Sequence, residues 1–191
     1  MKEIVLASAS PRRKEILDIT GLKFIVDTTG YKENMDYNLT PHKLAKFLSL
    51  EKAKAVRHKY KSALIIAADT FIVHDDKLLG KPYSENAARM MLRSLSGSKH
   101  SVITGFTIID TASGEIVTRF VETRVFFRKI TKHEIESYIK SGEPMDKAGA
   151  YAIQGLGALF IKKIEGDYFN VMGLPLGALM ESLKKFGIYV L

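Results

Sequence analysis

The pattern of apolar and polar positions predicts that strands and helices alternate in the first third of the chain. Apolar runs at 4–7 and 24–26 have the length of buried strands. Helices are predicted at about 11–20 and 41–60. Each helix begins after a hydroxyl residue that is followed by proline, which is a common start signal because proline fits the first helical position.

The middle of the chain favours strands that are joined by tight turns. A continuous apolar run at 63–68 has strand length and is followed at once by Asp69. Two short apolar runs flank the residues 75–77 and predict a hairpin. Two longer stretches rich in β-branched and aromatic residues, 102–109 and 116–127, predict a second hairpin.

The remaining elements complete a mixed pattern. Ser84 is predicted to cap one helix, and Thr131 with Glu134 is predicted to form the capping box of another. The C-terminal part is predicted to hold a strand at 159–164, a helix at about 176–186 and a short end strand at 188–190. This succession is typical of an α/β or mixed α+β fold. Without an internal repeat or a long linker, we expect one domain over residues 1–191.

Composition narrows the class of protein. Hydrophobic residues make up 46% of the 191 residues, which is ample for a packed core. No apolar run approaches the roughly 20 residues of a membrane span, and the N-terminal segment becomes polar too soon for a signal peptide. The absence of cysteine excludes disulfides, thiolate metal sites and cysteine nucleophiles. Together these features predict a cytoplasmic protein.

The net charge of +8 indicates an anionic partner but does not identify it. Nucleic acid, phospholipid and free nucleotide all remain open on charge alone. The sequence contains neither a Walker A motif nor a GxGxxG motif, so a P-loop or Rossmann site is not indicated. The aromatic residues are scattered and form no obvious stacking platform for single strands. The histidines lack zinc-site spacing and are interpreted as surface residues: His42, His58, His74, His100 and His133.

Candidate phosphate chemistry lies at the first predicted strand-to-helix turn. Ser8 and Ser10 offer hydroxyls, and Arg12 and Arg13 offer guanidinium groups that match phosphate oxygens. A helix start adds free backbone N–H groups and the positive end of the helix dipole. A plain helix cap followed by surface arginines is an equally good interpretation of this segment.

Asp69 and Lys52 are the candidates for chemistry in the predicted interior. A carboxylate directly after a buried strand can act as a general base or a metal ligand, although a turn aspartate is the commoner interpretation. Lys52 falls between Ala45 and Leu48 on the apolar stripe of its helix. A lysine there must extend to solvent or meet a negative partner, and a bound phosphate would be one.

Two further candidates lie in glycine-containing loops. Lys81 lies in the rigid turn Gly80-Lys81-Pro82, which closely follows the Asp69 strand. Gln154 lies in the glycine-rich stretch 142–157, and its amide offers both a donor and an acceptor to the edge of a base. Each is alternatively an ordinary exposed loop residue.

The ordered motifs resemble those of the Maf-like proteins over essentially the whole chain. The matching segments are LASASPRRKEIL at 6–17, EKAKAV at 51–56, AADT at 67–70, LGKP at 79–82, the stretch from Gly142 through Gly155, and GDYFNVMGLPL at 166–176. The resemblance implies a mixed α/β fold with an elongated mixed sheet, and two lobes that flank a deep nucleotide-binding cleft. It also implies hydrolysis of a nucleoside triphosphate to a monophosphate and pyrophosphate with Mg²⁺ or Mn²⁺.

The resemblance also implies roles for individual residues. Asp69 is the implied proton acceptor. The positions implied to set substrate choice are Arg12, Thr70 and Gln154. The positions implied to contact phosphates are Ser8, Arg13, Lys52 and Lys81. The acids implied to face the metal are Asp69 and Glu33, with Asp36 as the alternative to Glu33.

The form Ile153-Gln154-Gly155 resembles the subgroup that acts on dTTP and UTP, with modified pyrimidine nucleotides in its range. Subgroups with other preferences, including 7-methyl-GTP, carry Glu where Gln154 stands. An amide both donates to and accepts from a pyrimidine edge, whereas a carboxylate accepts from the N–H groups of guanine. Two other functions stay open: a regulatory role in septum formation, which the resemblance suggests, and a basic nucleic-acid-binding module, which the net charge of +8 suggests. As a whole, the resemblance favours the enzyme. It predicts no stable nucleic-acid or membrane partner, and a homodimer stays open.

Overall fold

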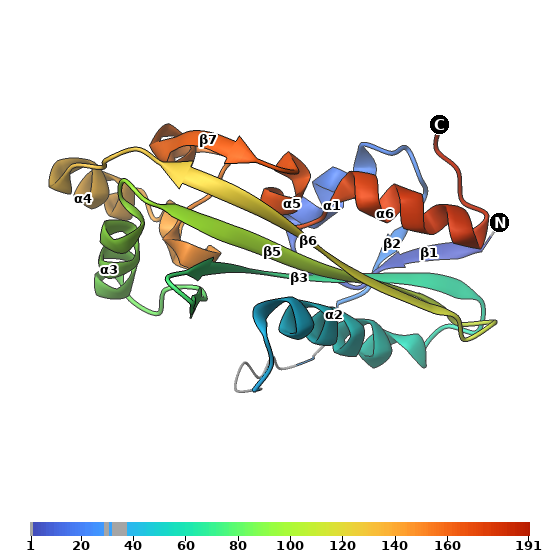
Figure 1. The fold of residues 1–191 in the computed structure, drawn as a ribbon. Helices are drawn as coiled ribbons and strands as arrows, with labels where there is room; N and C mark the ends of the chain where they lie inside the picture. Colours follow the sequence, from blue (N-terminus) through green and yellow to red (C-terminus); the bar gives the residue numbers. More distant parts are fainter. Residues whose placement is uncertain (1, 29–30, 32–37) are drawn as a thin grey trace. The chain divides into compact units, whose positions relative to one another are not determined.

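The computed structural model describes residues 2–28, 31 and 38–191 of the chain. Its strands form a seven-stranded sheet in the order β2-β1-β3-β5-β6-β7, and β4 pairs with β3 (Figure 1). The strands are β1 (Glu3–Leu6), β2 (Ile25–Val26), β3 (Ala63–His74), β4 (Lys77–Leu79), β5 (Lys99–Asp110), β6 (Ile116–Phe127) and β7 (Ile161–Glu165). β1 runs parallel to β2 and β3, whereas β4 and β7 pair antiparallel with β3 and β6. The predicted mixed α/β class is therefore confirmed.

The helices follow the predicted order along the chain, except that the helix at Tyr168–Met172 was not predicted. They are α1 (Pro11–Asp18), α2 (Pro41–Arg57), α3 (Glu85–Leu95), α4 (Lys132–Lys140), α5 (Tyr168–Met172) and α6 (Leu176–Leu183). Short 3₁₀ helices are η1 (Glu143–Asp146), η2 (Ala148–Ala150), η3 (Leu156–Phe160) and η4 (Lys184–Phe186). None of the helices in the described ranges is long and apolar enough to cross a membrane.

The chain divides into two compact units. Unit 1 comprises Met1–Asp69, Thr104–Val121 and Gly173–Leu191, and unit 2 comprises Thr70–Ile103 and Glu122–Met172. Each unit draws on segments that are distant in the sequence, because β3, β5 and β6 contribute residues to both. The cleft between two lobes that the resemblance implies stays a prediction.

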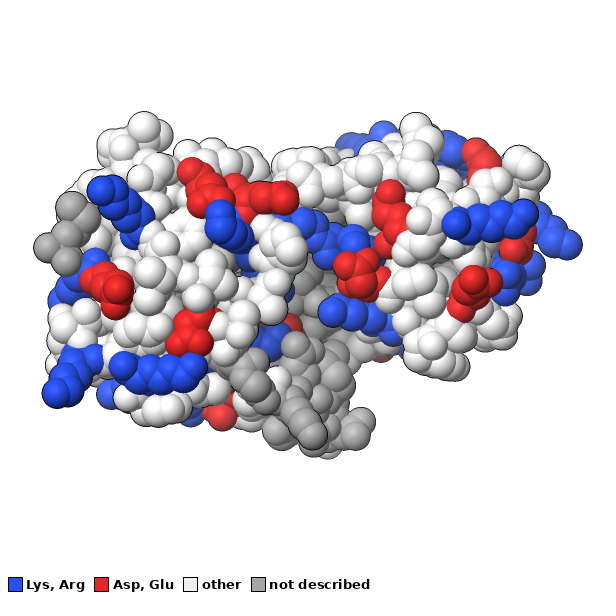
Figure 2. All heavy atoms as spheres, turned by 180° about the vertical axis from the view of Figure 1, so that it is seen from behind, with Lys and Arg blue, Asp and Glu red and all other residues white. Residues whose placement is uncertain are grey.

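The surface charge is mixed on the face that Figure 2 shows. Lys and Arg side chains alternate there with Asp and Glu side chains. Several of the exposed or half-buried cations in the described residues have acidic partners, as in the ion pairs Lys59–Asp27, Arg89–Glu136, Arg119–Glu181 and Arg128–Glu134. The surplus of +8 is therefore not gathered into one basic stripe on this face.

Unit 1 has helices on both faces of its part of the sheet, with α2 on one face and α1 and α6 on the other (Figure 1). The Thr107 hydroxyl lies 2.9 Å from that of Ser49 on α2 and 3.0 Å from that of Thr118. Arg119, the next residue of β6, donates instead to Glu181 of α6 over 2.8 Å. Successive strand residues point to opposite faces, so Thr118 and Arg119 mark the two helical layers.

The backbones of β5 and α2 approach each other closely at Gly105. A Cβ atom at this position would lie 2.1 Å from the carbonyl oxygen of Ala45. Only glycine allows this approach, since a methyl group would need the space that the α2 backbone occupies. The contact sets the depth of α2 on the sheet. It therefore also places Lys52, which lies two helical turns beyond Ala45.

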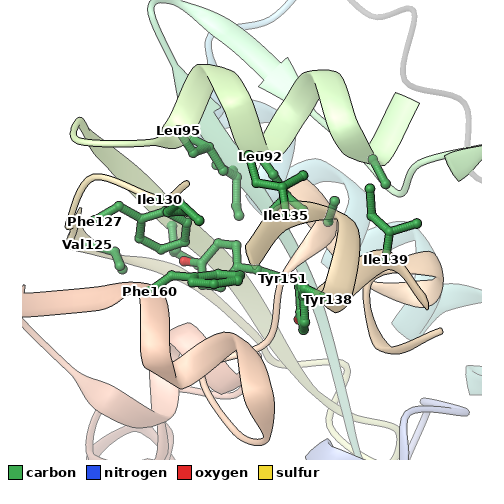
Figure 3. Close-up of a cluster of buried hydrophobic side chains, with 14 residues drawn as sticks. Leu92, Leu95, Val125, Phe127, Ile130, Ile135, Tyr138, Ile139, Tyr151 and Phe160 are labelled. Atoms are coloured by element: carbon green, nitrogen blue, oxygen red, sulfur yellow. The ribbon is translucent and has the colours of Figure 1, made fainter. Parts of the chain in front are cut away.

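Unit 2 has its own hydrophobic core, in which α3 and α4 pack on the strands (Figure 3). Its buried members include Leu92, Leu95, Val125, Phe127, Ile130, Ile135, Tyr138, Ile139, Tyr151 and Phe160. The predicted helix starts are confirmed. The Ser84 hydroxyl accepts from the Ala87 N–H over 3.1 Å, and Thr131 with Glu134 forms a complete capping box.

Two predicted strand boundaries are wrong. β3 continues through Asp69 to His74, so Asp69 lies inside the strand and not after its end. The extension exists because β4 pairs antiparallel with the last residues of β3. In the described structure residues 188–190 form no strand. The Ile188 N–H instead donates to the Leu183 carbonyl over 3.2 Å and closes the end of the C-terminal helix.

The interpretation of all histidines as surface residues is also wrong. His74 and His100 are buried, with 8% and 3% of their surface exposed. The His74 ring nitrogens lie 3.0 and 3.3 Å from backbone carbonyl oxygens, and His100 Nε2 lies 2.7 Å from the Tyr151 hydroxyl. Burial lowers the pKa of His100 to about 3, so this imidazole is neutral at physiological pH. The alternation of apolar and polar residues along a strand does not by itself reveal these contacts.

Candidate functional site

The turn from β1 into α1 forms beside β3. The Ala7 N–H donates to the Ile66 carbonyl over 2.7 Å, which extends the parallel pairing one residue beyond β1. The chain then turns, and the Ser8 side chain is buried at the turn. Its hydroxyl oxygen accepts from the Ser10 N–H over 3.3 Å and from an Arg13 guanidinium N–H over 3.2 Å. Ser8 and Arg13, both predicted phosphate contacts, therefore lie together.

Arg13 also connects this turn to the segment that precedes α6. Its Nε–H donates to the Gly173 carbonyl over 2.8 Å. The neighbouring Arg12 is half-buried and makes no hydrogen bond or ion pair with the residues that the structure describes. The Ser10 side chain makes no capping hydrogen bond to α1. The start of α1 thus offers the Arg12 guanidinium group together with backbone N–H groups to which no capping side chain is bonded. Such a helix start is suited to binding an anion.

Lys52 and Asp69 form a buried ion pair in unit 1. The Lys52 ammonium lies 2.5 Å from Asp69 Oδ1, and the two side chains are 11% and 8% exposed. Asp69 lies three residues beyond Ile66, the last residue of β3 that is paired in register with β1. Of the two alternatives for Lys52, extension to solvent or a negative partner, the structure shows the second, and the partner is the Asp69 carboxylate. Each group compensates the charge of the other, since an unpaired buried charge would be costly.

Both partners of the ion pair carry groups that are suited to phosphate chemistry. A lysine ammonium has three N–H donors, so one ammonium group can donate to more than one anion. A carboxylate has two oxygens, and in this pair Lys52 donates to Oδ1. A carboxylate within hydrogen-bond reach of a positioned water molecule can accept a proton from it.

The other predicted site residues belong to unit 2. Thr70 follows Asp69 in β3 and is half-buried, whereas Lys81 and Gln154 are exposed. The Gly149 N–H donates to the Gly80 carbonyl over 2.9 Å. This bond joins the turn that carries Lys81 to the stretch that leads to Gln154.

Only part of the implied metal site falls within the described structure. Glu33 and Asp36 lie outside the described residues. Within the described ranges, no group of three or more Asp, Glu, His or Cys side chains is arranged to hold a metal ion. Mg²⁺ is commonly held by one or two carboxylates together with substrate phosphates. The hard oxygens of Asp69 fit such a partial donor set.

Sequence reasoning missed three residues that shape these sites. Gly173 accepts from Arg13, and Tyr138 and Glu143 contact the backbone on either side of Gln154. The only sequence signal was that Gly173 and Glu143 fall within segments that resemble the family. Their roles depend on contacts that span up to 160 positions in the chain.

The fold and these residues define a mixed α/β protein with a basic strand-to-helix turn and a buried lysine–carboxylate pair. The model of the family described as Maf-like protein matches residues 3–186. The chain belongs to the Maf-like protein family.

The chain is similar to named relatives over its full length and shows a weaker likeness to a solved structure. A dTTP/UTP pyrophosphatase of Pelotomaculum thermopropionicum is 49% identical over 100% of both chains. A dTTP/UTP pyrophosphatase of a Geobacillus species is 47% identical over 98% of this chain and 100% of its own. A HAM1 protein from Coxiella burnetii has a TM-score of 0.48 and 12% identity over 69% of this chain and 76% of its own.

Proposed function

We propose that this protein is a nucleoside triphosphate pyrophosphatase that hydrolyses dTTP and UTP to the monophosphate and pyrophosphate. The proposal is carried by the full-length identity of 49% to a relative with that activity in its name. The buried Lys52–Asp69 pair and the basic turn after β1 support it, because they supply a base and cations for a polyphosphate.

The triphosphate is held mainly by electrostatics in this proposal. Its roughly four negative charges are offset by basic side chains. The proposed contributors are Arg12, Arg13, Lys52 and Lys81. Ser8 assists indirectly, because its hydroxyl accepts from Arg13 and orients that guanidinium group.

Asp69 is the proposed general base. It accepts a proton from the attacking water while Lys52 holds the carboxylate in place. The proposed attack is at the α-phosphorus: the new bond joins the water oxygen to this phosphorus, the α–β anhydride bond breaks, and pyrophosphate leaves. A bound Mg²⁺ or Mn²⁺, held by Asp69 and phosphate oxygens, would stabilise negative charge on the phosphates. Glu33 is proposed as a further metal-facing acid.

The function is tested by measuring pyrophosphate release from canonical and modified nucleoside triphosphates, with and without Mg²⁺ or Mn²⁺. We expect metal-dependent release that is fastest with dTTP, UTP or a modified pyrimidine nucleotide. Release from none of these substrates would refute the proposal. Steeply salt-dependent DNA or RNA binding without pyrophosphate release would instead favour a nucleic-acid-binding module. The septum role, the homodimer and the cytoplasmic location stay predictions.

Substrate choice is proposed to depend on Arg12, Thr70 and Gln154. Replacing Gln154 with Glu removes the amide donor, so we expect kcat/KM for dTTP and UTP to fall by about 10-fold relative to purine triphosphates. Asn86→Asp is a matched control, because it makes the same amide-to-carboxylate change at an exposed position of α3. An unchanged substrate profile in Gln154→Glu would show that the amide does not select the base.

A further inference from the structure

The loop of residues 152–157, here called the Gln154 loop, is anchored by the carboxylate of Glu143. Oε2 of Glu143 accepts from the Leu156 N–H and Oε1 accepts from the Gly157 N–H, each over 3.0 Å. The Tyr138 hydroxyl donates to the same Oε1 over 2.9 Å. An ionised carboxylate accepts at both oxygens, whereas a glutamine amide accepts at only one.

Tyr138 fastens the other side of the loop. Its hydroxyl accepts from the Ala152 N–H over 3.2 Å while it donates to Glu143. Tyr138 is 3% exposed, and its ring packs at 90° on that of Phe160, with the ring centroids 5.0 Å apart. Figure 3 shows both rings within the core of unit 2. Backbone positions on both sides of Gln154 are therefore bonded to side chains that are fixed by this core.

The glycines of the loop fit this anchor. Gly155 has φ +89°, and a Cβ atom there would lie 2.6 Å from Glu143 Oε2. A Cβ atom at Gly157 would lie 2.5 Å from the Ala152 carbonyl oxygen and 2.7 Å from the Tyr138 hydroxyl. The loop can approach the carboxylate and close on itself only because both residues lack side chains.

The charge state of Glu143 agrees with this geometry. Burial acts to raise its pKa, but the hydrogen bonds from Gly157, Leu156 and Tyr138 outweigh burial and leave the pKa lowered. The ionised carboxylate is therefore the form that the loop favours.

We propose that Glu143, together with Tyr138, is a positioning residue that holds the Gln154 loop in one conformation for recognition of the pyrimidine base. The Gln154 side chain is exposed, so the place of its amide depends on the backbone that carries it. A loop that is ordered before the substrate binds avoids part of the entropy cost of recognition. This inference rests on the proposed role of Gln154 in substrate choice.

The kinetic test compares Glu143→Gln with Tyr138→Phe. Each variant keeps the side-chain shape and removes anchoring bonds. We expect kcat/KM for dTTP and UTP to fall by about 10-fold in Glu143→Gln and by less in Tyr138→Phe. Turnover of purine triphosphates should change little, so discrimination between pyrimidine and purine triphosphates should fall. An equal loss for every substrate would overturn the positioning role. If Glu143→Gln fails to fold, Tyr138→Phe carries the test.

Glu136→Gln is the matched control. Glu136 lies on α4 and pairs with Arg89 over 2.7 Å, so the variant loses an ion pair in the same unit without touching the loop. We expect its discrimination between pyrimidine and purine triphosphates to equal that of the wild type. A loss of discrimination as large as that of Glu143→Gln would assign the effect to unit 2 as a whole and contradict the proposal.

Backbone hydrogen exchange tests the anchor separately from the substrate. The bonded amides of the loop should exchange about 10-fold faster in Glu143→Gln, and unchanged exchange would refute the anchor. Faster exchange with normal discrimination would refute the link between the anchor and base recognition. A third outcome is that Glu143→Gln shows faster exchange and lower discrimination while Gln154→Glu keeps the wild-type substrate profile. That outcome would refute only the proposed role of the Gln154 amide.

Discussion

Replacing Asp69 with Asn is expected to lower the rate of pyrophosphate release by about 100- to 10,000-fold. The amide keeps the shape of the side chain and an oxygen that can accept from Lys52, which lies 2.5 Å from the carboxylate. It cannot take a proton from water at neutral pH. The measurement is kcat with dTTP and UTP at saturating metal, together with a thermal unfolding curve that reports whether the variant is folded.

Asp110→Asn is a stringent control for this variant. Asp110 is also a buried carboxylate that pairs with a lysine, since Lys2 donates to it over 2.5 Å. The hydrogen bond from Lys2 is the main cause that lowers the pKa of Asp110 to about 2. Loss of this pair should reduce stability and leave kcat near the wild-type value. Near-normal turnover of Asp69→Asn, or a comparable loss in both variants, would remove Asp69 from the role of base.

Replacing Gly105 with Ala is expected to destabilise the fold by about 3 kcal/mol, at the upper end for overpacking. The new methyl carbon would lie 2.1 Å from the Ala45 carbonyl oxygen and 2.3 Å from its carbon. Because these are backbone atoms, no side chain can turn aside, and α2 must shift. The free energy of unfolding in urea measures the cost. The shift should also disturb the Lys52–Asp69 pair and reduce activity.

Gly177→Ala is the matched control for Gly105→Ala. Gly177 lies in α6, and no atom lies within 4 Å of the place where its Cβ would be. Alanine is the better helix former, so this change should leave stability equal or higher by up to about 1 kcal/mol. If both variants unfold at the same urea concentration, then the close approach of β5 to α2 is not what requires glycine at 105.

Local signals in the sequence predicted much of the secondary structure. The hydroxyl and proline pairs marked the starts of α1 and α2, and the Thr131 capping box formed as predicted. The turn between β3 and β4 was also predicted. Its residues Asp75 and Asp76 adopt the positive φ that a two-residue hairpin turn needs. These features depend on residues that are at most a few positions apart, so the local sequence contains the physical cause of each helix start and turn.

Strand boundaries and buried polar residues were less predictable. The continuation of β3 past Asp69 depends on pairing with β4, and the burial of His100 depends on Tyr151 at a distance of 51 positions. Neither partner can be read from the local pattern, because side chains from distant segments satisfy these groups.

By itself, the sequence determined the mixed α/β class, most of the order of helices and strands, and the set of candidate site residues. Local propensity, capping and motif resemblance were sufficient for those. Only the tertiary structure decided that Lys52 meets Asp69, that Ser8 orients Arg13, and that Glu143 holds the Gln154 loop. These are contacts between different elements, and their existence depends on how buried charges and backbone groups find partners once the chain has packed.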